Sequence, residues 1–524
     1  MTWRPHAATM NAVTTTKPKP NLRIMISSVP LRDALLAAFA ALALAAAFPK
    51  IGAAWLVPFG TAALFWIWQG ASWKRAALLG WFAGLIFFAA DFAWVGHTVA
   101  RYIGLFGPFL ALGPALIEAP FFALAGALAA IAYQRANPNL APLAAAAAFT
   151  FCEWLRSIGV LAAPFDQLGY TQADSPLRAI AAYAGTYGIT FVLCTLGAYL
   201  ADALHRRTWR PLAIAGASVA ILSFAAWFAW PARHLPPPRI AVSAIQGNIA
   251  QSLKWNSLKL AVRRYSAMTR SAAPSNPRLI VWPETVIPTE LDADFVLIRR
   301  FTQLSREMRA TIVAGSLAAG PAALYNALFI FSPEGGYTVY DKRQLVPFAE
   351  SFPGRRFLSW LPYIGMLNGG LAAGTTDGVY TTTALPIAPL ICWESAFSDL
   401  AFAQLRRGAQ LLVITTDDAW FGKTSGPYMH AQIAQLRAIE SGAYVVRAAA
   451  TGISGIIAPD GRWQARAGLG DRAVVNGRVG PKVTTVFSQV GPTAIGVLIF
   501  VLYIVLLVPL EMAPADASAW PDAR

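Results

Sequence analysis

The chain has 524 residues, of which 56% are hydrophobic and only 13% are charged, about half the charged share of an ordinary soluble domain. This composition excludes a disordered chain and a purely water-soluble enzyme, and it predicts a polytopic membrane protein. The formal net charge of +16 fits the Lys and Arg residues that flank membrane spans on the cytoplasmic side. Nucleic acid is therefore not expected as a partner.

Eight apolar runs predict helices that cross a bilayer, whose core of about 30 Å needs roughly 20 apolar residues per span. The runs are Ala34–Phe48, Gly52–Trp68, Ala76–Gly96, Leu105–Tyr133, Leu140–Trp154, Ile180–Leu200, Leu212–Trp230 and Gly491–Leu510. The sequence therefore predicts a polytopic α-helical membrane domain of seven spans over residues 31–231. A closing transmembrane helix is predicted over residues 491–510.

The basic connections between these runs predict their orientation. If the polar, basic tail of residues 1–30 is cytoplasmic, then Lys74–Arg75, Arg135 and His205–Arg210 are cytoplasmic too, as the positive-inside rule requires. Residues 511–524 form a second cytoplasmic tail. Seven spans leave residues 232–490 outside, so we expect an inner-membrane protein whose large extramembrane domain faces the periplasm of a two-membrane bacterium.

Four carboxylates lie within these runs or at their ends. They are Asp91, Glu118, Glu153 and Asp202. A charge at membrane depth can mark a functional site, but we favour a buried polar contact or a position at headgroup level. The sequence has no internal repeat of the kind that many transporters carry.

Between residues 232 and 490 the pattern changes to short β-rich runs that alternate with amphipathic helices. The predicted strands are Ile240–Ile245, Leu279–Trp282, Thr311–Gly315, Ala327–Phe331, Pro389–Cys392, Leu411–Thr415 and Gly452–Ala458. The predicted helices are Leu258–Thr269, Asp292–Met308 and Tyr428–Ser441. Because the strands are nearly continuous apolar runs, both faces of their sheets should be covered. The segment is therefore an α/β or layered α+β domain.

Polar residues stand at the ends of these segments, where active residues gather in α/β domains. Glu284 follows one predicted strand, Lys342 and Glu350 lie eight residues apart, and Cys392 ends another strand just before Glu394. A nucleophilic cysteine needs a base to take its proton and a positive donor to stabilise an oxyanion. Glu, Lys and Cys can supply these functions together, although a single cysteine at a strand end is more often a small buried hydrophobe.

The cysteines and histidines predict neither a disulfide framework nor a metal site. Cys152, Cys194 and Cys392 are an odd and sparse set, and the five histidines lack metal-ligand spacing. Since Cys152 and Cys194 lie within predicted spans, Cys392 has no obvious extramembrane partner and can stay a free thiol. No metal and no cofactor are expected.

Seven segments around these residues carry a known pattern. They are Gln246–Asn248, Gln251–Trp255, Val281–Pro288, Tyr340–Glu350, Phe352–Pro353, Ile391–Glu394 and Asp418–Gly422. They resemble the nitrilase superfamily, whose catalytic set is Glu–Lys–Cys in that chain order, and within it the integral-membrane apolipoprotein N-acyltransferase family. With the pattern of spans, the resemblance covers nearly the whole chain. It implies that residues 232–490 form a nitrilase-like catalytic domain, an α-β-β-α sandwich.

The resemblance also implies a ping-pong transfer of a fatty acyl group from a phospholipid to the α-amine of the S-diacylglyceryl cysteine that begins an apolipoprotein. In this scheme Cys392 forms a thioester and Glu284 acts as general base. Lys342 stabilises the oxyanion, together with the backbone N–H of Trp393. The expected partners are thus the phospholipid donor, the apolipoprotein acceptor and the bilayer itself.

Three further residues receive supporting roles from the same resemblance. Glu350 is expected to orient the catalytic set. Glu394 is a candidate for the same task, with solvated surface as its alternative. Trp255 resembles a family residue near the substrate entrance, and an aromatic anchor at the membrane interface is an equally good interpretation.

The sequence departs from the family pattern at two positions. The residue after the nucleophile is commonly Tyr, whereas here it is Trp393, which keeps the aromatic ring and loses the phenolic hydroxyl. The pair before Ala419 commonly reads Asn-Asp, whereas here it is Asp417-Asp418. The second departure adds a carboxylate.

Two other functions remain open from the sequence. One is a membrane-bound nitrilase-like amidase or nitrile hydrolase, which would use water as its second nucleophile, and the other is a non-enzymatic membrane scaffold or transporter. Seven spans are more than a simple tether needs, and a scaffold has no use for the Glu–Lys–Cys set. The apolar stretch Phe357–Leu371 is either a membrane-dipping lid or part of the domain core.

Overall fold

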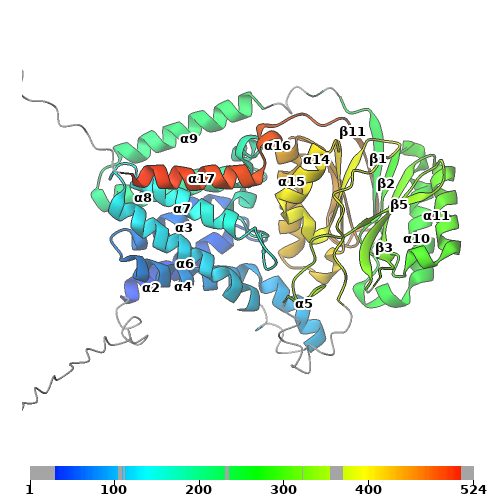
Figure 1. The fold of residues 1–524 in the computed structure, drawn as a ribbon, viewed down its shortest axis with the longest axis horizontal. Coiled ribbons are helices and arrows are strands. Elements are labelled where there is room, and N and C mark those ends of the chain that lie inside the picture. The colour runs from blue at the N-terminus through cyan, green and yellow to red at the C-terminus, as the bar shows by residue number, and fades with distance from the viewer. Residues whose placement is uncertain are drawn as a thin grey trace, which may run out of the picture.

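The computed structural model of the chain describes residues 30–103, 109, 112–230, 235, 237–321, 323–353 and 370–508. Nearly all of the two predicted tails, the predicted boundary at residues 231–232 and most of the Phe357–Leu371 stretch lie outside these residues. A bundle of helices forms one end of the molecule and two β-sheets form the other, with a layer of helices between them (Figure 1).

Each of the eight predicted apolar runs corresponds to a helix. These helices are α2 (Leu31–Ala46), α3 (Val57–Trp68), α4 (Trp73–Asp91), α6 (Leu112–Arg135), α7 (Ala141–Leu155), α8 (Ala181–Arg206), α9 (Arg210–Phe228) and α17 (Pro492–Leu507). By length and composition, α4, α6, α8 and α9 can cross a membrane, whereas α3, α7 and α17 are shorter apolar helices. The helical half is thus a candidate membrane domain, and the number of spans stays a prediction.

The predicted run Ala76–Gly96 is wrong at its end, because it covers parts of two helices. Helix α4 stops at Asp91, and a separate helix α5 (Ala93–Ile103) begins after Phe92. Helix α4 packs closely on α6 at Gly80. A Cβ at this position would lie 2.3 Å from the backbone oxygen of Phe122, so no residue with a side chain fits there without a shift. Small residues allow this close approach of helices in lipid.

Three of the four carboxylates singled out in the predicted spans are held in buried polar contacts. Arg156 pairs with Glu118 at 3.0 Å and with Asp166, and all three side chains are almost fully buried. Glu153 and Asp202 also have hydrogen-bond or ion-pair partners. For Glu118, Glu153 and Asp202, the interpretation as buried polar contacts is confirmed.

The other half of the chain forms two β-sheets. The first has the order β11-β1-β2-β3-β4-β5, and the second has the order β10-β9-β8-β7-β6. Their strands are β1 (Ile240–Gln246), β2 (Leu279–Val281), β3 (Thr311–Ala318), β4 (Tyr325–Phe331), β5 (Tyr337–Asp341), β6 (Ile387–Ile391), β7 (Leu411–Thr416), β8 (Tyr444–Ala449), β9 (Ser454–Ile457), β10 (Trp463–Ala467) and β11 (Ala473–Val479). Strands β1, β2 and β3 run parallel, as do β6, β7 and β8. All seven predicted strands are confirmed, and β5, β8, β10 and β11 were not predicted.

The two sheets pack face to face between two layers of helices. Because side chains alternate along a strand, Val242 and Ala244 of β1 join the core between the sheets while Ile245 joins the core on the outer face. That outer face is covered by α10 (Leu258–Ser271) and α11 (Phe295–Met308). The second sheet is covered by α14 (Ser398–Arg406) and α15 (Gly426–Ser441), while α16 (Val486–Val490) precedes α17. The predicted α-β-β-α sandwich is confirmed.

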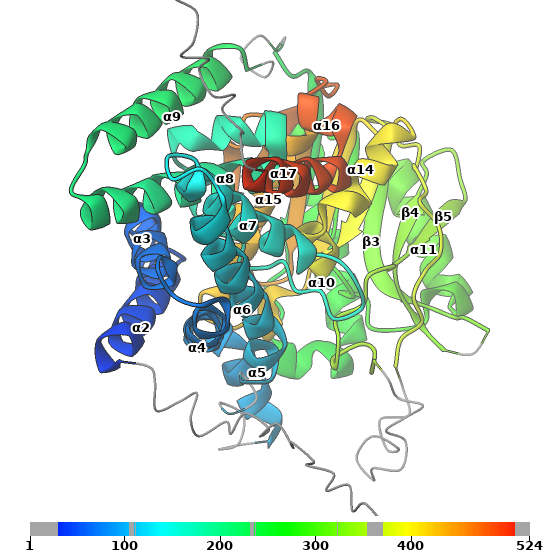
Figure 2. The ribbon, with the colours of Figure 1, turned by 60° about the vertical axis from the view of Figure 1, so that its left-hand side comes forward.

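Helix α15 belongs to both halves of the molecule. Its small residues Ala434 and Ala438 pack on the second sheet, whereas Ile433, Leu436 and Ile439 join the core of the helical bundle. The two views agree that α15 lies between the sheets and the bundle, and that α9 runs along the outside of the bundle (Figures 1 and 2). Among the described residues of α9, only Ala215 is buried.

Candidate active site

The predicted catalytic residues follow strands that end at the same edge of the sandwich. Glu284 comes three residues after β2, Lys342 directly follows β5, and Cys392 directly follows β6. Since β4 is antiparallel to both β3 and β5, β5 runs in the same direction as β2 and β3. The carboxyl ends of β2 and β5 therefore point the same way, and the site draws residues from both sheets.

Glu284 and Lys342 are in direct contact. Lys342 Nζ lies 3.3 Å from Glu284 Oε1, which also accepts a hydrogen bond of 2.7 Å from Asn326 Nδ2. The second oxygen of Glu284 accepts a bond of 2.8 Å from the backbone N–H of Asp417. Burial alone would raise the pKa of Glu284, but Lys342, Lys254 and these donors hold that pKa below its usual range. Glu284 is therefore a carboxylate at neutral pH, as a general base must be.

Glu350 holds Lys342 and Asn326 from the other side. Its Oε1 accepts from Lys342 Nζ at 2.9 Å and from Asn326 Nδ2 at 3.1 Å, while its Oε2 accepts from the backbone N–H of Val346. Burial would lower the pKa of Lys342, but the charges of Glu284 and Glu350 hold it above its ordinary value. Lys342 is therefore a fixed ammonium group. Asn326, which bridges the two carboxylates, was not predicted; its signal is an amide in the otherwise apolar strand β4.

Cys392 is the first residue of the short helix η9 (Cys392–Ala396), in a strained turn directly after β6. Its φ of +52° lies in the left-handed region that residues other than glycine seldom adopt, and such strain is often kept at functional sites. The side chain is a partly exposed free thiol. Burial, followed by the charge of Glu284, raises the pKa of Cys392, while Lys342 lowers it. The cysteine is therefore a neutral thiol at rest, and it needs a base to become a nucleophile.

Glu394 is fully buried, so its interpretation as solvated surface is wrong. One of its oxygens accepts from the backbone N–H groups of Arg343 and Gln344, and the other accepts from the backbone N–H of Ile391 at 2.7 Å. The hydroxyl of Tyr340 donates to the same carboxylate. Glu394 thus ties the turn that carries Cys392 to the segment that carries Lys342.

A second buried network supports the same turn from behind. His430 of α15 lies 3.1 Å from the backbone oxygen of Cys392 through Nε2, which also contacts the Ser395 hydroxyl at 2.8 Å. Its Nδ1 lies 2.9 Å from Asp418, which in turn pairs with Arg447 at 2.8 Å. This network was not predicted. Its only signals were a single histidine in the predicted helix Tyr428–Ser441 and an arginine in an apolar run.

The two tryptophans of the predicted site lie in different surroundings. Trp393 is buried and stacks on Phe165 of the helical half, with ring centroids 5.4 Å apart. Trp255 lies on the short helix η6 (Gln251–Asn256) and is 53% exposed. The ammonium group of Lys254 lies 5.6 Å from the centroid of its ring. Both interpretations of Trp255, substrate entrance and interface anchor, therefore stay predictions.

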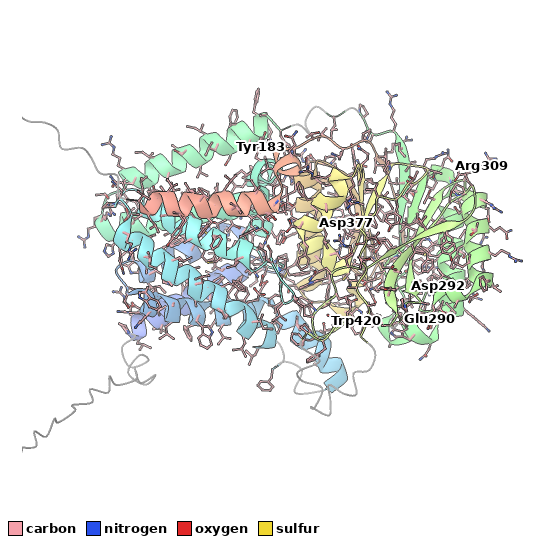
Figure 3. The ribbon with its side chains drawn as sticks, in the orientation of Figure 1. Tyr183, Glu290, Asp292, Arg309, Asp377 and Trp420 are labelled. Carbon is pink, nitrogen blue, oxygen red and sulfur yellow. The ribbon has the colours of Figure 1, made fainter. Side chains whose placement is uncertain are left out.

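The catalytic edge of the sandwich meets the helical half. Trp420, which follows β7 in the helix η10 (Asp418–Trp420), lies where the two halves join (Figure 3), and its backbone oxygen accepts a bond of 2.9 Å from Thr98 of α5. Nearby, Trp94 of α5 packs on Phe421, and their ring centroids are 4.5 Å apart. These contacts hold the segment after β7 against α5 of the helical half.

An α-β-β-α sandwich with Glu, Lys and Cys at its strand ends, joined to a bundle of apolar helices, defines a membrane-associated member of the carbon-nitrogen hydrolase class. Residues 241–485 match the family description "Carbon-nitrogen hydrolase", and residues 40–199 match "Apolipoprotein N-acyltransferase N-terminal domain". The apolipoprotein N-acyltransferase of Methylococcus capsulatus is 32% identical over 86% of this chain and 91% of its own length. That of Geobacter metallireducens is 30% identical over 86% and 90%, respectively. The chain belongs to the apolipoprotein N-acyltransferase family, and it is an acyltransferase.

Proposed function

We propose that the protein transfers a fatty acyl group from a phospholipid to the α-amine of the S-diacylglyceryl cysteine at the start of an apolipoprotein, through a thioester on Cys392. The observation that carries this proposal is the contact of the ionised Glu284 with Lys342 beside a thiol held in a strained turn. The family assignment as an acyltransferase removes the scaffold and transporter alternatives.

In the first half-reaction, Cys392 attacks the sn-1 ester of the phospholipid. The Sγ–C bond forms and the ester C–O bond breaks, while the thiol proton passes to Glu284 and then to the oxygen of the leaving lysophospholipid. Lys342 and the backbone N–H of Trp393 stabilise the charge on the tetrahedral oxygen. Glu350 and Asn326 keep Lys342 and Glu284 in place through their hydrogen bonds.

In the second half-reaction, the α-amine of the apolipoprotein attacks the thioester carbonyl. The N–C bond forms and the C–S bond breaks, and a proton of the amine passes through Glu284 to the sulfur of Cys392. A membrane-bound amidase would use water at this step instead. The two functions differ in their products, because only acyl transfer places the acyl chain on the amine of the acceptor.

The test uses the purified full chain in detergent with dioleoylphosphatidylethanolamine and a synthetic diacylglyceryl peptide. Mass spectrometry of the protein alone with the phospholipid should show one added oleoyl group on Cys392, and addition of the peptide should move that group to the peptide amine. Cys392→Ser should abolish both, whereas Cys152→Ala and Cys194→Ala should retain them. Release of free oleate with no acylated peptide would favour the amidase.

We also propose that the chain crosses the inner membrane eight times and holds the catalytic domain in the periplasm. The support is the placement of Lys74–Arg75, Arg135 and His205–Arg210 on one side by the predicted spans. In a background without native cysteines, a cysteine at Asn276 should react with an impermeant maleimide once the outer membrane alone is opened. A cysteine at Ala517 should react only after full permeabilisation, and the opposite pattern would invert the topology.

A further inference from the structure

Lys254 and Asp417 form an ion pair beside the general base. Lys254 Nζ contacts Asp417 Oδ2, and the two side chains are only 10% and 3% exposed. The backbone N–H of Asp417 donates to Glu284 Oε2 at 2.8 Å. Asp417 therefore holds Glu284 with its backbone and Lys254 with its side chain.

The pair joins two segments that belong to different sheets. Lys254 lies on η6, which connects β1 of the first sheet to the covering helix α10. Asp417 follows β7 of the second sheet. Within η6 the backbone bonds are local, from Leu253 to the oxygen of Ala250 and from Ser257 to that of Lys254. Before η6, Asn248 donates to the distant backbone oxygen of Ala450. Leu253 is 51% exposed, like its neighbour Trp255. The ion pair is thus a long-range tie between this largely exposed segment and the end of β7.

We propose that Lys254 is a positioning residue for acyl transfer, whose ion pair with Asp417 holds the Gln251–Asn256 segment over the site and balances the charge next to Glu284. This inference rests on the function proposed above. Lys254 touches no reacting atom in this scheme. It acts through Asp417, which binds the base directly.

The charges around Glu284 show why the balance matters. The ionisable residues that interact with Glu284 are Lys254, Lys342, Cys392 and Asp417. Behind them, Glu350 contacts Lys342 and Asp418 acts on Asp417. Lys342 and Lys254 lower the pKa of Glu284, while the charge of Glu284 raises the pKa of Asp417. Without Lys254, the Asp417 carboxylate beside Glu284 would lack its cation. A like charge at this range raises a carboxyl pKa, so Glu284 would take up a proton at a higher pH.

The experiment compares Lys254→Met, Lys254→Arg, Asp417→Asn and the double variant Lys254→Met/Asp417→Asn with the parent. The matched control is Lys259→Met, which removes an exposed lysine five residues along the same surface. For each protein, kcat/KM and KM for dioleoylphosphatidylethanolamine are measured as a function of pH. The acidic limb of kcat/KM reports the base of the free enzyme.

Lys254→Met should move the acidic limb upward by about one pH unit and raise KM severalfold, whereas Lys254→Arg and Lys259→Met should behave like the parent. Asp417→Asn should move the limb downward. The double variant should return the limb to near its parental position while KM stays raised, because the charge is balanced again but the tie is missing. A purely structural role for Lys254 would lower the melting temperature and activity at every pH without moving the limb, and that result would overturn the proposal.

A second measurement separates this proposal from the proposed function. In the Cys152→Ala/Cys194→Ala background, the rate at which iodoacetamide alkylates Cys392 is followed against pH, with no lipid substrate present. Lys254→Met should move this profile to higher pH, and the double variant should restore it. If the parent transfers no acyl group but the alkylation profiles shift in this way, the function fails and the role of Lys254 stands. If the profiles of Lys254→Met and parent coincide, the role of Lys254 is refuted.

Discussion

Replacement of Asn326 should slow acyl transfer, because its side-chain amide bridges the two carboxylates of the site. Its amide donates to Glu284 at 2.7 Å and to Glu350 at 3.1 Å, and a hydrogen bond to a charged group contributes about 1.5–3 kcal/mol. Asn326→Leu keeps the volume and removes both donors. Because Glu284 retains the backbone N–H of Asp417 and the ammonium of Lys342, we expect the loss of about one such bond. That loss corresponds to a rate lower by about 10–150-fold.

The assay is the rate of thioester formation on Cys392, measured by intact-protein mass spectrometry after mixing with dioleoylphosphatidylethanolamine. The matched control is Asn476→Leu on β11, because Asn476 accepts hydrogen bonds from Ser243 and Ser275 away from the site and its variant should acylate at the parental rate. If Asn326→Leu acylates within twofold of the parent at an unchanged melting temperature, the assignment of Asn326 as a support of the base is wrong.

Three further predictions follow from contacts in the site. Lys342→Met should slow thioester formation about 10²–10³-fold and also lower the melting temperature, because Glu284 and Glu350 lose their shared cation; a rate within tenfold of the parent would contradict this role. The acidic limb of thioester formation should have its midpoint below pH 4.5, since the pKa of Glu284 is held under that ordinary value and the ionised form is the active one; a midpoint above pH 5.5 in the parent would refute this assignment. Arg447→Leu should lower the melting temperature by about 10 °C, because the removal of one partner of a buried ion pair costs about 3–5 kcal/mol, and differential scanning calorimetry checks it; a change under 2 °C would show that Asp418 does not need this arginine.

Much of the fold could be predicted from apolar periodicity, and polar residues concealed several of the strands that were missed. The strand β8 is fully buried, but Arg447 interrupts its apolar run. The strands β10 and β11 alternate between covered and exposed residues and carry polar side chains such as Arg466 and Asn476. Strand β11 is recognised only once its neighbour is known, because it pairs with β1 from a distant part of the chain. Strand β10 forms a local hairpin with β9, and its polar residues concealed it.

The proposed catalytic set could be located in the sequence because its residues lie in short motifs, each at the end of a strand. The residues that hold this set in place could not be predicted, because they belong to no motif. Asn326, His430 and Arg447 stand alone among apolar neighbours, and only the packing of several strands and of α15 brings them to the site. Sequence spacing carries no information about such contacts, since each joins segments dozens of residues apart.

Helix α15 joins the sandwich and the helical bundle, which the sequence predicts as two separate domains. Ile433, Leu436 and Ile439 would be bared to water if the sandwich were separated from the bundle, at a cost of about 1.5–3 kcal/mol for each side chain. Together that is roughly 5–9 kcal/mol, comparable with the whole stability of many domains. The same helix carries His430 against the turn of Cys392. The enzyme is therefore poorly suited to dissection. A fragment that began at β1 would keep α15 and His430, but it would expose these three side chains and lose the ring of Phe165 that stacks on Trp393, the residue after Cys392. The helical half thus also supports the turn of the proposed nucleophile.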